Sequence, residues 1–489
     1  MDILLKYPGG KGKRKLPVPL LLLCALLLLS ACSAGDEKPE LPPEPEEGVL
    51  IYAALNPVTP ELKTSVNRFN ESHPDAKLEI RDYSDEGGPE RLLVELVAGR
   101  VPDIMELHQT GTGMYATSNP TPEAMWFRDP FSEEPVSRAF WMPYRQLVQK
   151  GYLEDLWPYI EKDPELGREG VLEAPLKAAE VNGGLYMLFK QVSVNTLIGP
   201  KKLIGERQGW TMAELMEAFS SMPADSTILR YGTVQRDVFF KWFSSTLNQY
   251  IDWEAGRCSF DNEEFRSSLL FISSFPSEFS SPYTEEQLEE EIVWRQLDGL
   301  QLLEPVRLAH LRELPFYDTY FEGGSAFVGY PTADGSVGSS FIIHGSKLAM
   351  SSACEDKDAA WDFMRELILK SYNQPRMKEA HELQWVRIPI NRKDYELGNR
   401  VDLADKAEDI PPRFTLDDGP EFRVLPANED DLQLYEALLN STTQIYWPDN
   451  KLSDVVWESI GPYLAGDKSL EDTIALVQDR VTLYINEQK

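Results

Sequence analysis

The sequence is short of the residues on which most catalytic and metal sites depend. Its 489 residues include only five histidines, too far apart for metal-ligand spacing: His73, His108, His310, His344 and His381. It has no HExxH, GxSxG, phosphate-loop or paired CxxC motif. Asp and Glu number 80, so a pair of carboxylates like that of a glycosidase can always be found, and its presence is no evidence for an enzyme. We therefore expect a binding protein without metal or cofactor rather than an enzyme.

Positive charge is also scarce. The chain has 48 Lys and Arg against 80 Asp and Glu, a net charge of −32 at pH 7. Residues 1–31 carry a net charge of +4, so the rest of the chain is more acidic still, near −36. Such a surface repels nucleic acid and anionic lipid, and we exclude both as partners.

Long apolar runs are missing except near the N-terminus, where Leu20–Leu29 follows a segment rich in lysine. Ten residues cannot cross a hydrocarbon core ~30 Å thick, because a helix needs roughly 20 to do so. The run is typical of a secretory signal rather than a membrane span.

The end of this run and the next three residues, Leu29-Ser30-Ala31-Cys32, resemble the bacterial lipobox, in which the cysteine carries the lipid once the chain is cut before it. We predict a signal peptide at 1–31, a lipid anchor such as palmitate at Cys32, and a tether at 32–47. The tether is acidic and rich in proline, a composition that cannot bury a core. The protein is then extracytoplasmic and anchored to the cell membrane. The alternative is an ordinary signal peptide with an incidental cysteine.

Cysteine is rare in the remaining body, which contains only Cys258 and Cys354. They could form a disulfide outside the cell or stay free as small buried apolar residues. The sequence leaves both possibilities open.

Strand and helix patterns alternate at the start of the body. Buried strands are indicated at Val49–Leu55, in AKLEIRDY and in VPDIMEL, with helices between them that begin at Thr59-Pro60-Glu61 and near Leu92. This β-α-β-α-β order predicts an α/β fold with a parallel sheet. Ligands bind beyond the carboxyl ends of such strands, here Ala54–Asn56 and Glu106–Gln109.

Three later helices have clear signals. Thr211 and Glu214 form a Thr-x-x-Glu capping box, which we interpret as structural. Residues 285–300 predict an acidic amphipathic helix with a solvated face. Ser469 with Asp472 caps the last helix, whose apolar side chains follow helical spacing.

Seven stretches resemble the family 1 extracellular solute-binding proteins, the maltose-binding-like lipoproteins of ABC importers. The resemblance spans 48–487, and these stretches occur in the expected order: AGRVPDIMEL, GYLEDLWPYIEKD, GGLYMLFK, GWTMAELMEAF, FVGYPTADGSVGS, SSACEDKDAAWDFMREL and YLAGDKSLEDTIALVQDRVTLYINEQ. The resemblance implies a two-lobed, type II periplasmic-binding-protein-like fold with a ligand cleft between the lobes. The segment 111–140 departs from the family because it is longer and richer in proline and aromatic residues.

The same resemblance implies that the chain crosses between lobes three times. The crossings are expected near Phe189–Val194, Phe327–Tyr330 and Trp385–Pro389. The N-lobe is then 48–190 plus 330–385, and the C-lobe is 191–329 plus 386–489.

A sugar presents flat C–H faces and hydroxyl groups, so its site needs aromatic rings and polar side chains. Asn56, Glu106 and His108 follow the first and third strands, where the family places polar ligand contacts. The alternative for Asn56 is that it is only a turn residue, and the alternative for Glu106 and His108 is that they lie at a solvated loop end. Asp103 is expected to orient structure instead.

Other candidates come from the remaining resemblance. In DVFFKWF, most rings must be core, and Trp242 is the favoured ligand contact. Tyr317 and Tyr320, before the second crossing, and Trp385 and Arg387, at the third crossing, are further candidates. Asp334 is also a candidate, and its alternative role is to organise a turn. Trp457 is on a helix where relatives carry a stacking tryptophan, but core packing is favoured for it.

The leading hypothesis is a monomeric receptor for a small-molecule solute, most simply a carbohydrate. It would deliver its ligand to the permease of an ABC importer by hinge closure. The alternatives are a ligand-sensing ectodomain for a partner receptor and a surface glycoside hydrolase. The sequence does not name the solute.

Overall fold

The computed structural model describes residues 48–109, 140–253, 255–321, 323–369, 387–404, 414–415, 421–422, 425–447 and 449–487. The predicted signal peptide, lipid anchor Cys32 and tether lie outside the described residues, as do Trp385 and residues 111–139. The side chain of Tyr320 is also outside them.

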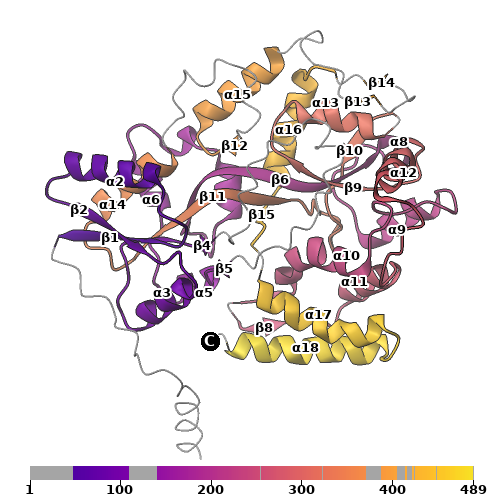
Figure 1. The fold of residues 1–489 in the computed structure, drawn as a ribbon, viewed down its shortest axis with the longest axis horizontal. Helices are drawn as coiled ribbons and strands as arrows, with labels where there is room; N and C mark the ends of the chain where they lie inside the picture. The colour runs from indigo at the N-terminus through magenta and orange to yellow at the C-terminus, as the bar shows by residue number, and fades with distance from the viewer. Residues whose placement is uncertain are drawn as a thin grey trace, which may run out of the picture. The chain divides into compact units, whose positions relative to one another are not determined.

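Strands of the described residues form a nine-stranded mixed sheet and three two-stranded ones. The path through the large sheet is β10-β6-β11-β3-β1-β2, with β9 and β12 paired to β6 and β15 paired to β11 (Figure 1). The strands are β1 (Val49–Ala54), β2 (Lys77–Asp82), β3 (Ile104–Glu106), β4 (His108–Gln109), β5 (Phe140–Trp141), β6 (Leu188–Pro200), β7 (Ile251–Asp252), β8 (Arg257–Cys258), β9 (Glu304–Leu308), β10 (Ser325–Phe327), β11 (Ser340–Met350), β12 (Ile388–Pro389), β13 (Phe414–Thr415), β14 (Glu421–Phe422) and β15 (Gln444–Ile445).

Helices connect and flank these strands. The α-helices are α2 (Pro60–Ser72), α3 (Gly88–Val97), α5 (Tyr144–Gln149), α6 (Trp157–Lys162), α7 (Glu173–Ala178), α8 (Lys201–Ile204), α9 (Met212–Ser220), α10 (Gln235–Lys241), α11 (Glu263–Ser273), α12 (Glu285–Leu297), α13 (Glu313–Tyr317), α14 (Lys357–Ile368), α15 (Arg392–Ala404), α16 (Glu429–Ser441), α17 (Asn450–Leu464) and α18 (Leu470–Glu487). Short 3₁₀ turns are η1 (Arg168–Gly170), η2 (Phe243–Ser245), η3 (Leu247–Tyr250) and η4 (Asp318–Tyr320).

The predicted β-α-β-α-β start is confirmed. β1 pairs in parallel with β2 on one side and with β3 on the other, and α2 and α3 make the two connections. Thr59 caps α2, because its hydroxyl accepts a hydrogen bond from the Leu62 backbone N–H at 3.2 Å. The carboxyl ends of β1 and β3 therefore lie side by side.

Two strands run through the middle of the large sheet. β6 and β11 pair antiparallel from Leu188 and Leu348 to Asn195 and Ser340, and both ribbons are visible at the centre of Figure 1. Gly345 lies in the irregular part of this pairing, between His344 and Lys347, with φ 72. A glycine tolerates this left-handed conformation without steric cost.

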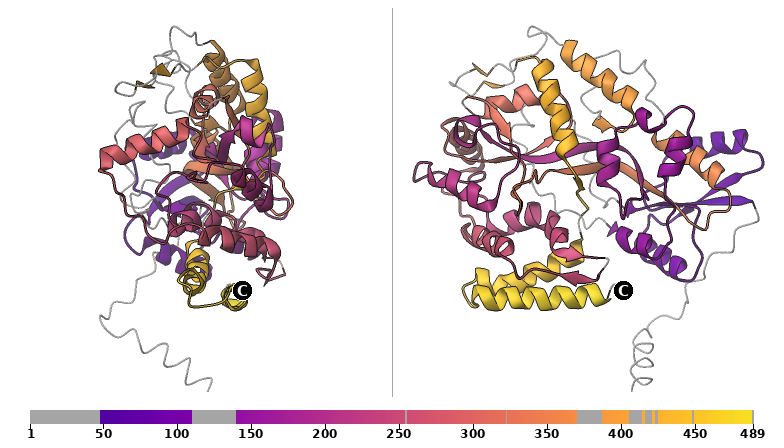
Figure 2. Two further views of the ribbon diagram at one scale, coloured as in Figure 1. Left: turned by 90° about the vertical axis from the view of Figure 1, so that its right-hand side faces the viewer. Right: turned by 180° about the vertical axis from the view of Figure 1, so that it is seen from behind.

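Buried apolar side chains form two clusters. We define the first cluster by Tyr52, Leu92, Met105, Trp361 and Phe363, with the side chains packed around them. The second cluster is defined by Trp210, Trp242, Phe260, Val456 and Val477. It includes α17 and α18, which lie side by side in every view (Figure 2).

Both clusters use residues of the central strands. β6 contributes Val194 to the first cluster and Leu197 to the second. β10 contributes Phe327 to the first and Ala326 to the second. Two cores that meet on shared strands are what an α/β chain of this length requires.

The later helix predictions are also confirmed. Thr211 and Glu214 form the capping box of α9, and the helix expected at 285–300 is α12. The Ser469 hydroxyl accepts from the Asp472 backbone N–H at 3.1 Å, at the start of α18. In the described part of the chain, no helix combines the length and apolar character that crossing a bilayer requires.

The two body cysteines are free. Cys354 is buried in the first cluster, whereas Cys258 is half-buried against the second. The structure therefore favours unpaired thiols over a disulfide.

Candidate functional site

The ends of β1 and β3 meet at the carboxylate of Glu106. Its Oε2 accepts hydrogen bonds from the Leu55 N–H at 2.9 Å and from both the backbone N–H and the side-chain Nδ2 of Asn56 at 2.8 Å. Its Oε1 accepts from the Tyr52 hydroxyl at 2.9 Å. Asn56 Nδ2 also donates to the carbonyl oxygen of His108 at 2.8 Å. The three polar candidates at the strand ends are therefore in contact through Asn56.

Burial sets the electrostatics of this group. Glu106 is 3% exposed, and its burial raises the carboxyl pKa, although the hydrogen bonds from Asn56 lower it. Burial and the charge of Lys347 lower the pKa of His108 to about 3, so the ring is neutral at pH 7. Burial also lowers the pKa of Lys347 to about 8, against the opposing effect of Glu106. Glu106 is accordingly a positioning group that holds Asn56.

A row of polar side chains lies on the neighbouring strands. Residues opposite one another in an antiparallel pair point to the same face of the sheet, and so do alternate residues of one strand. Asn195 is opposite Arg307 of β9, and Gln191 is opposite His344 of β11. With Ser193 between them on β6, these five residues form what we call the central polar face.

Hydrogen bonds link this face internally and to the second cluster. Ser193 Oγ and His344 Nε2 are 2.8 Å apart, and the donor depends on the histidine tautomer. The Tyr330 hydroxyl donates to Asn195 Oδ1 at 3.2 Å. Because Tyr330 belongs to the second cluster, the central polar face extends to that cluster's edge.

Cations surround the histidine of this face. Burial, together with the charges of Arg387, Arg307 and Lys347, lowers the pKa of His344 to about 2. The charge of Lys347 also lowers the pKa of His108. Lys347 therefore links the central polar face to the group formed by Asn56, Glu106 and His108, which we call the strand-end group. Both histidines are neutral hydrogen-bonding groups at pH 7.

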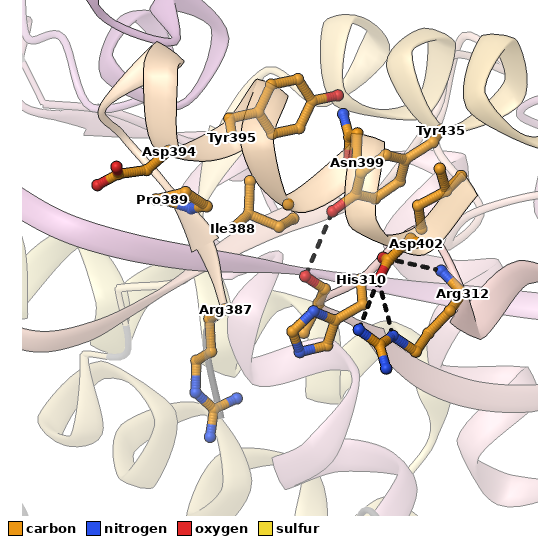
Figure 3. Close-up of a pocket in the computed structure, with 13 residues that line it drawn as sticks. His310, Arg312, Arg387, Ile388, Pro389, Asp394, Tyr395, Asn399, Asp402 and Tyr435 are labelled. Atoms are coloured by element: carbon orange, nitrogen blue, oxygen red, sulfur yellow. Dashed lines mark hydrogen bonds and ion pairs between the residues drawn. The ribbon is translucent and has the colours of Figure 1, made fainter. Parts of the chain in front are cut away.

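Figure 3 shows where Arg387 lies. Its side chain is exposed and extends away from the small cavity that α15, α16 and β12 enclose. That cavity has a volume of about 30 Å³, the space of a single water molecule, and cannot admit a sugar. Its wall is fixed by the Arg312–Asp402 ion pair at 2.6 Å. Arg387 thus lines the cavity, but its side chain extends away from it and its charge acts on His344 of the central polar face.

The favoured aromatic candidate has a different setting. Trp242 is 2% exposed and lies in the second cluster. Its ring is stacked on Phe243 with centroids 5.3 Å apart, and meets Phe271 and Tyr330 edge-on at 4.9 and 5.3 Å. This placement corrects the sequence-based preference, because a ring enclosed in this way is core and presents no face to a solute. Trp242 supports Tyr330, which in turn contacts Asn195.

Two more candidates have structural partners. Tyr317 is 8% exposed in the first cluster, and its hydroxyl is 3.5 Å from the Arg307 carbonyl oxygen. Asp334 is exposed, and its Oδ1 accepts from the Ser336 N–H at 3.0 Å and from the Thr332 hydroxyl at 3.1 Å. Asp334 therefore organises a turn, which was the alternative interpretation from the sequence.

The two residues that the sequence assigned to structure behave as expected. Asp103 Oδ2 accepts from the Ile51 backbone N–H at 2.7 Å and so ties β1 to the start of β3. Trp457 packs against Phe239 and Phe240, with ring centroids 5.1 and 5.4 Å away.

Sequence reasoning named none of the five residues of the central polar face as a candidate. The alternation Gln-Val-Ser-Val-Asn at 191–195 is a signal for a strand with one polar side, and it was available in the sequence. Arg307 and Tyr446 had no such signal. The backbone N–H of Tyr446 donates to the Phe341 carbonyl oxygen at 2.7 Å, and the charge of Arg307 acts on the Tyr446 hydroxyl. Among the described residues no three His, Cys, Asp or Glu side chains gather as metal ligands would.

No protein-family model and no curated protein sequence matches this chain. Solved structures do match it. A periplasmic oligogalacturonide binding protein from Yersinia enterocolitica is 14% identical, with 90% of this chain and 99% of that chain covered and a TM-score of 0.50. This likeness shows the fold, and the predicted two-lobed, periplasmic-binding-protein-like α/β fold is confirmed.

Two further structures are similar over comparable lengths. The sugar-binding protein MalE from Xanthomonas citri is 14% identical over 90% of this chain and 98% of its own, with a TM-score of 0.48. An extracellular solute-binding protein family 1 from Alicyclobacillus acidocaldarius is 11% identical over 92% of this chain and 100% of its own, with a TM-score of 0.43.

Proposed function

We propose that this protein is an extracytoplasmic receptor that binds a carbohydrate solute and delivers it to the permease of an ABC importer. The observation that supports this most directly is the central polar face, which continues from the strand-end group to the edge of the second cluster. The fold it shares with a periplasmic binding protein supports the same function.

The polar groups of this face match the needs of a sugar. Asn195 and Arg307 offer amide and guanidinium groups to the hydroxyls of a saccharide, and the fully buried Ser193 holds His344 beside them. Asn56, held by Glu106, supplies a further polar contact. Tyr446, which is half-buried and whose hydroxyl feels the charge of Arg307, is the aromatic candidate beside these groups. The buried Tyr330 holds Asn195 in place through its hydroxyl, 3.2 Å from Asn195 Oδ1.

Delivery would follow from hinge closure. In this proposal the N-lobe is 48–190 plus 330–385, the C-lobe is 191–329 plus 386–489, and the solute contacts both only in the closed state. Such a ligand shifts the population toward closure because it binds that state more tightly. β6 and β10, which contribute to both clusters, lie near two of the proposed crossings.

The proposal is tested with a thermal-shift screen of the purified protein against a saccharide library. A ligand at 100 times its Kd adds ~2.7 kcal/mol to the free energy of unfolding. Small-angle scattering should then show a smaller radius of gyration with ligand and an unchanged far-ultraviolet circular dichroism spectrum. Turnover of the bound saccharide, or an unchanged radius at saturation, would contradict the proposal.

The anchor is a separate part of the proposal. Cys32 would carry the lipid, and the acidic segment after it would hold the folded body away from the membrane. Replacement Cys32→Ser should abolish labelling by a fatty-acid analogue while solute binding survives. Persistent labelling of the variant would exclude Cys32 as the anchor.

A further inference from the structure

The distribution of positive charge is uneven in this acidic protein. The chain carries a net charge of −32, yet three cations, Arg307, Arg387 and Lys347, act together on His344. At long range the chain repels an anion, and at physiological ionic strength this repulsion is screened beyond about 8 Å. A local group of cations therefore decides whether an anion can bind at this place.

Strand register puts two of the guanidinium groups in one row. Arg307 of β9 is opposite Asn195 of β6. Ile388 of β12 is opposite Val192 of β6, so the preceding residue, Arg387, continues this pairing opposite Ser193. Ser193 and Asn195 are two residues apart, which corresponds to roughly 7 Å along the strand. The two arginines accordingly flank the central polar face along one edge of β6.

The Arg307 side chain is available to a ligand. It is exposed between the buried residues Val306 and Leu308, and its guanidinium makes no hydrogen bond or ion pair within the described part of the chain. The nearest acid on its strand, Glu304, is paired with Arg230 at 3.1 Å. The ladder thus offers a guanidinium whose neighbouring carboxylate is already neutralised.

The second arginine lies further along the same edge of β6. Arg387 is exposed and points away from Asp394 and Asp402 in Figure 3. Asp402 is paired with Arg312 at 2.6 Å. Guanidinium groups bind carboxylates through two parallel hydrogen bonds, which makes arginine well suited to an acidic ligand.

We propose that the central polar face takes a saccharide that carries a carboxylate, with Arg307 and Arg387 as the groups that hold the carboxylate. Asn195 and His344 then bind its hydroxyls, and the buried Ser193 orients the His344 ring. This inference rests on the proposed function, because it specifies the solute class of the same site.

The test compares acidic trisaccharides with uncharged partners of the same size. The probes are trimers of galacturonic, glucuronic and mannuronic acid, the methyl ester of each, maltotriose, sodium acetate and inorganic phosphate. Binding to the purified full chain is measured by isothermal titration calorimetry at two salt concentrations. We expect one acidic trimer to bind, with its methyl ester at least roughly 30-fold weaker and with lower affinity at high salt.

Variants assign the contact to individual residues. Arg307→Gln and Arg387→Gln should each weaken binding of the acidic trimer by roughly 10- to 100-fold, and Arg307→Lys should recover part of the loss. Arg257→Gln is the charge control, since Arg257 is 78% exposed on β8 and outside this face. Melting temperatures without ligand should not change, which excludes misfolding as the cause.

Each other outcome is decisive. If neutral saccharides bind as well as acidic ones, or Arg307→Gln has no effect, this inference fails and the proposed function stands. Equal binding of acetate or phosphate would mark a simple anion site and also overturn the inference. If no saccharide of either kind binds, the inference and the proposed function fail together.

Discussion

The strand-end group around Glu106 and the aromatic group around Trp242 are both candidates from sequence, and they differ in what they leave available. Glu106 accepts from Tyr52, Leu55 and Asn56, and thereby presents Asn56 beside His108. Trp242 is enclosed by three other rings. One buried residue orients a polar contact, whereas the other stabilises a core. Burial alone therefore does not separate a functional from a structural role.

The largest expected effect is on the aromatic group. Replacement Trp242→Ala should lower the free energy of unfolding by about 3–5 kcal/mol, because it empties a well-packed core position. Urea unfolding without ligand measures this loss. Trp457→Ala is the control, since Trp457 is only half-buried and a smaller loss is expected. A stable Trp242→Ala protein with strongly weakened saccharide binding would return Trp242 to the binding site.

A smaller loss is expected in the strand-end group. Glu106→Leu removes the acceptor of several buried donors, which should lower the free energy of unfolding by about 2–4 kcal/mol. It should also weaken solute binding, because Asn56 is no longer held. Glu79→Leu is the matched control on β2, where the carboxylate has 52% exposure and pairs with Lys77 at the surface. The control should change stability by less than about 1 kcal/mol. Equal stability of the two variants would contradict the positioning role of Glu106.

The smallest effect concerns pH. The pKa of His108 in the folded protein is about 3, below its ordinary value of about 6.5, so the unfolded chain binds more protons between these values. The stabilising contribution is present above pH 6.5 and is lost as the pH falls through this window. His108→Gln should reduce the pH slope of the unfolding free energy by up to about 1.4 kcal/mol per pH unit. Urea titrations at pH 4.5 to 7.5 measure it, and an unchanged slope would show that His108 is not buried in its neutral form.

Local patterns predicted one part of the site and not the other. Asn56, Glu106 and His108 were found because parallel strands bring their carboxyl ends to the same edge, so strand order in the sequence implies their proximity. Arg307 comes from a strand 200 residues after β3, and nothing in its neighbourhood indicates which strand it joins. Its place opposite Asn195 follows from long-range pairing alone.

The sequence by itself determined the α/β start, the helix caps at Thr59 and Thr211, and the polar alternation of residues 191–195, because each depends on neighbours within a few residues. It also determined the strongly acidic net charge. Only the tertiary structure decided that Trp242 is core and that Arg307 and Arg387 lie along one edge of β6. The reason is physical: an aromatic side chain suits a core as well as a sugar, and a cation's neighbours are set by which distant strands pair.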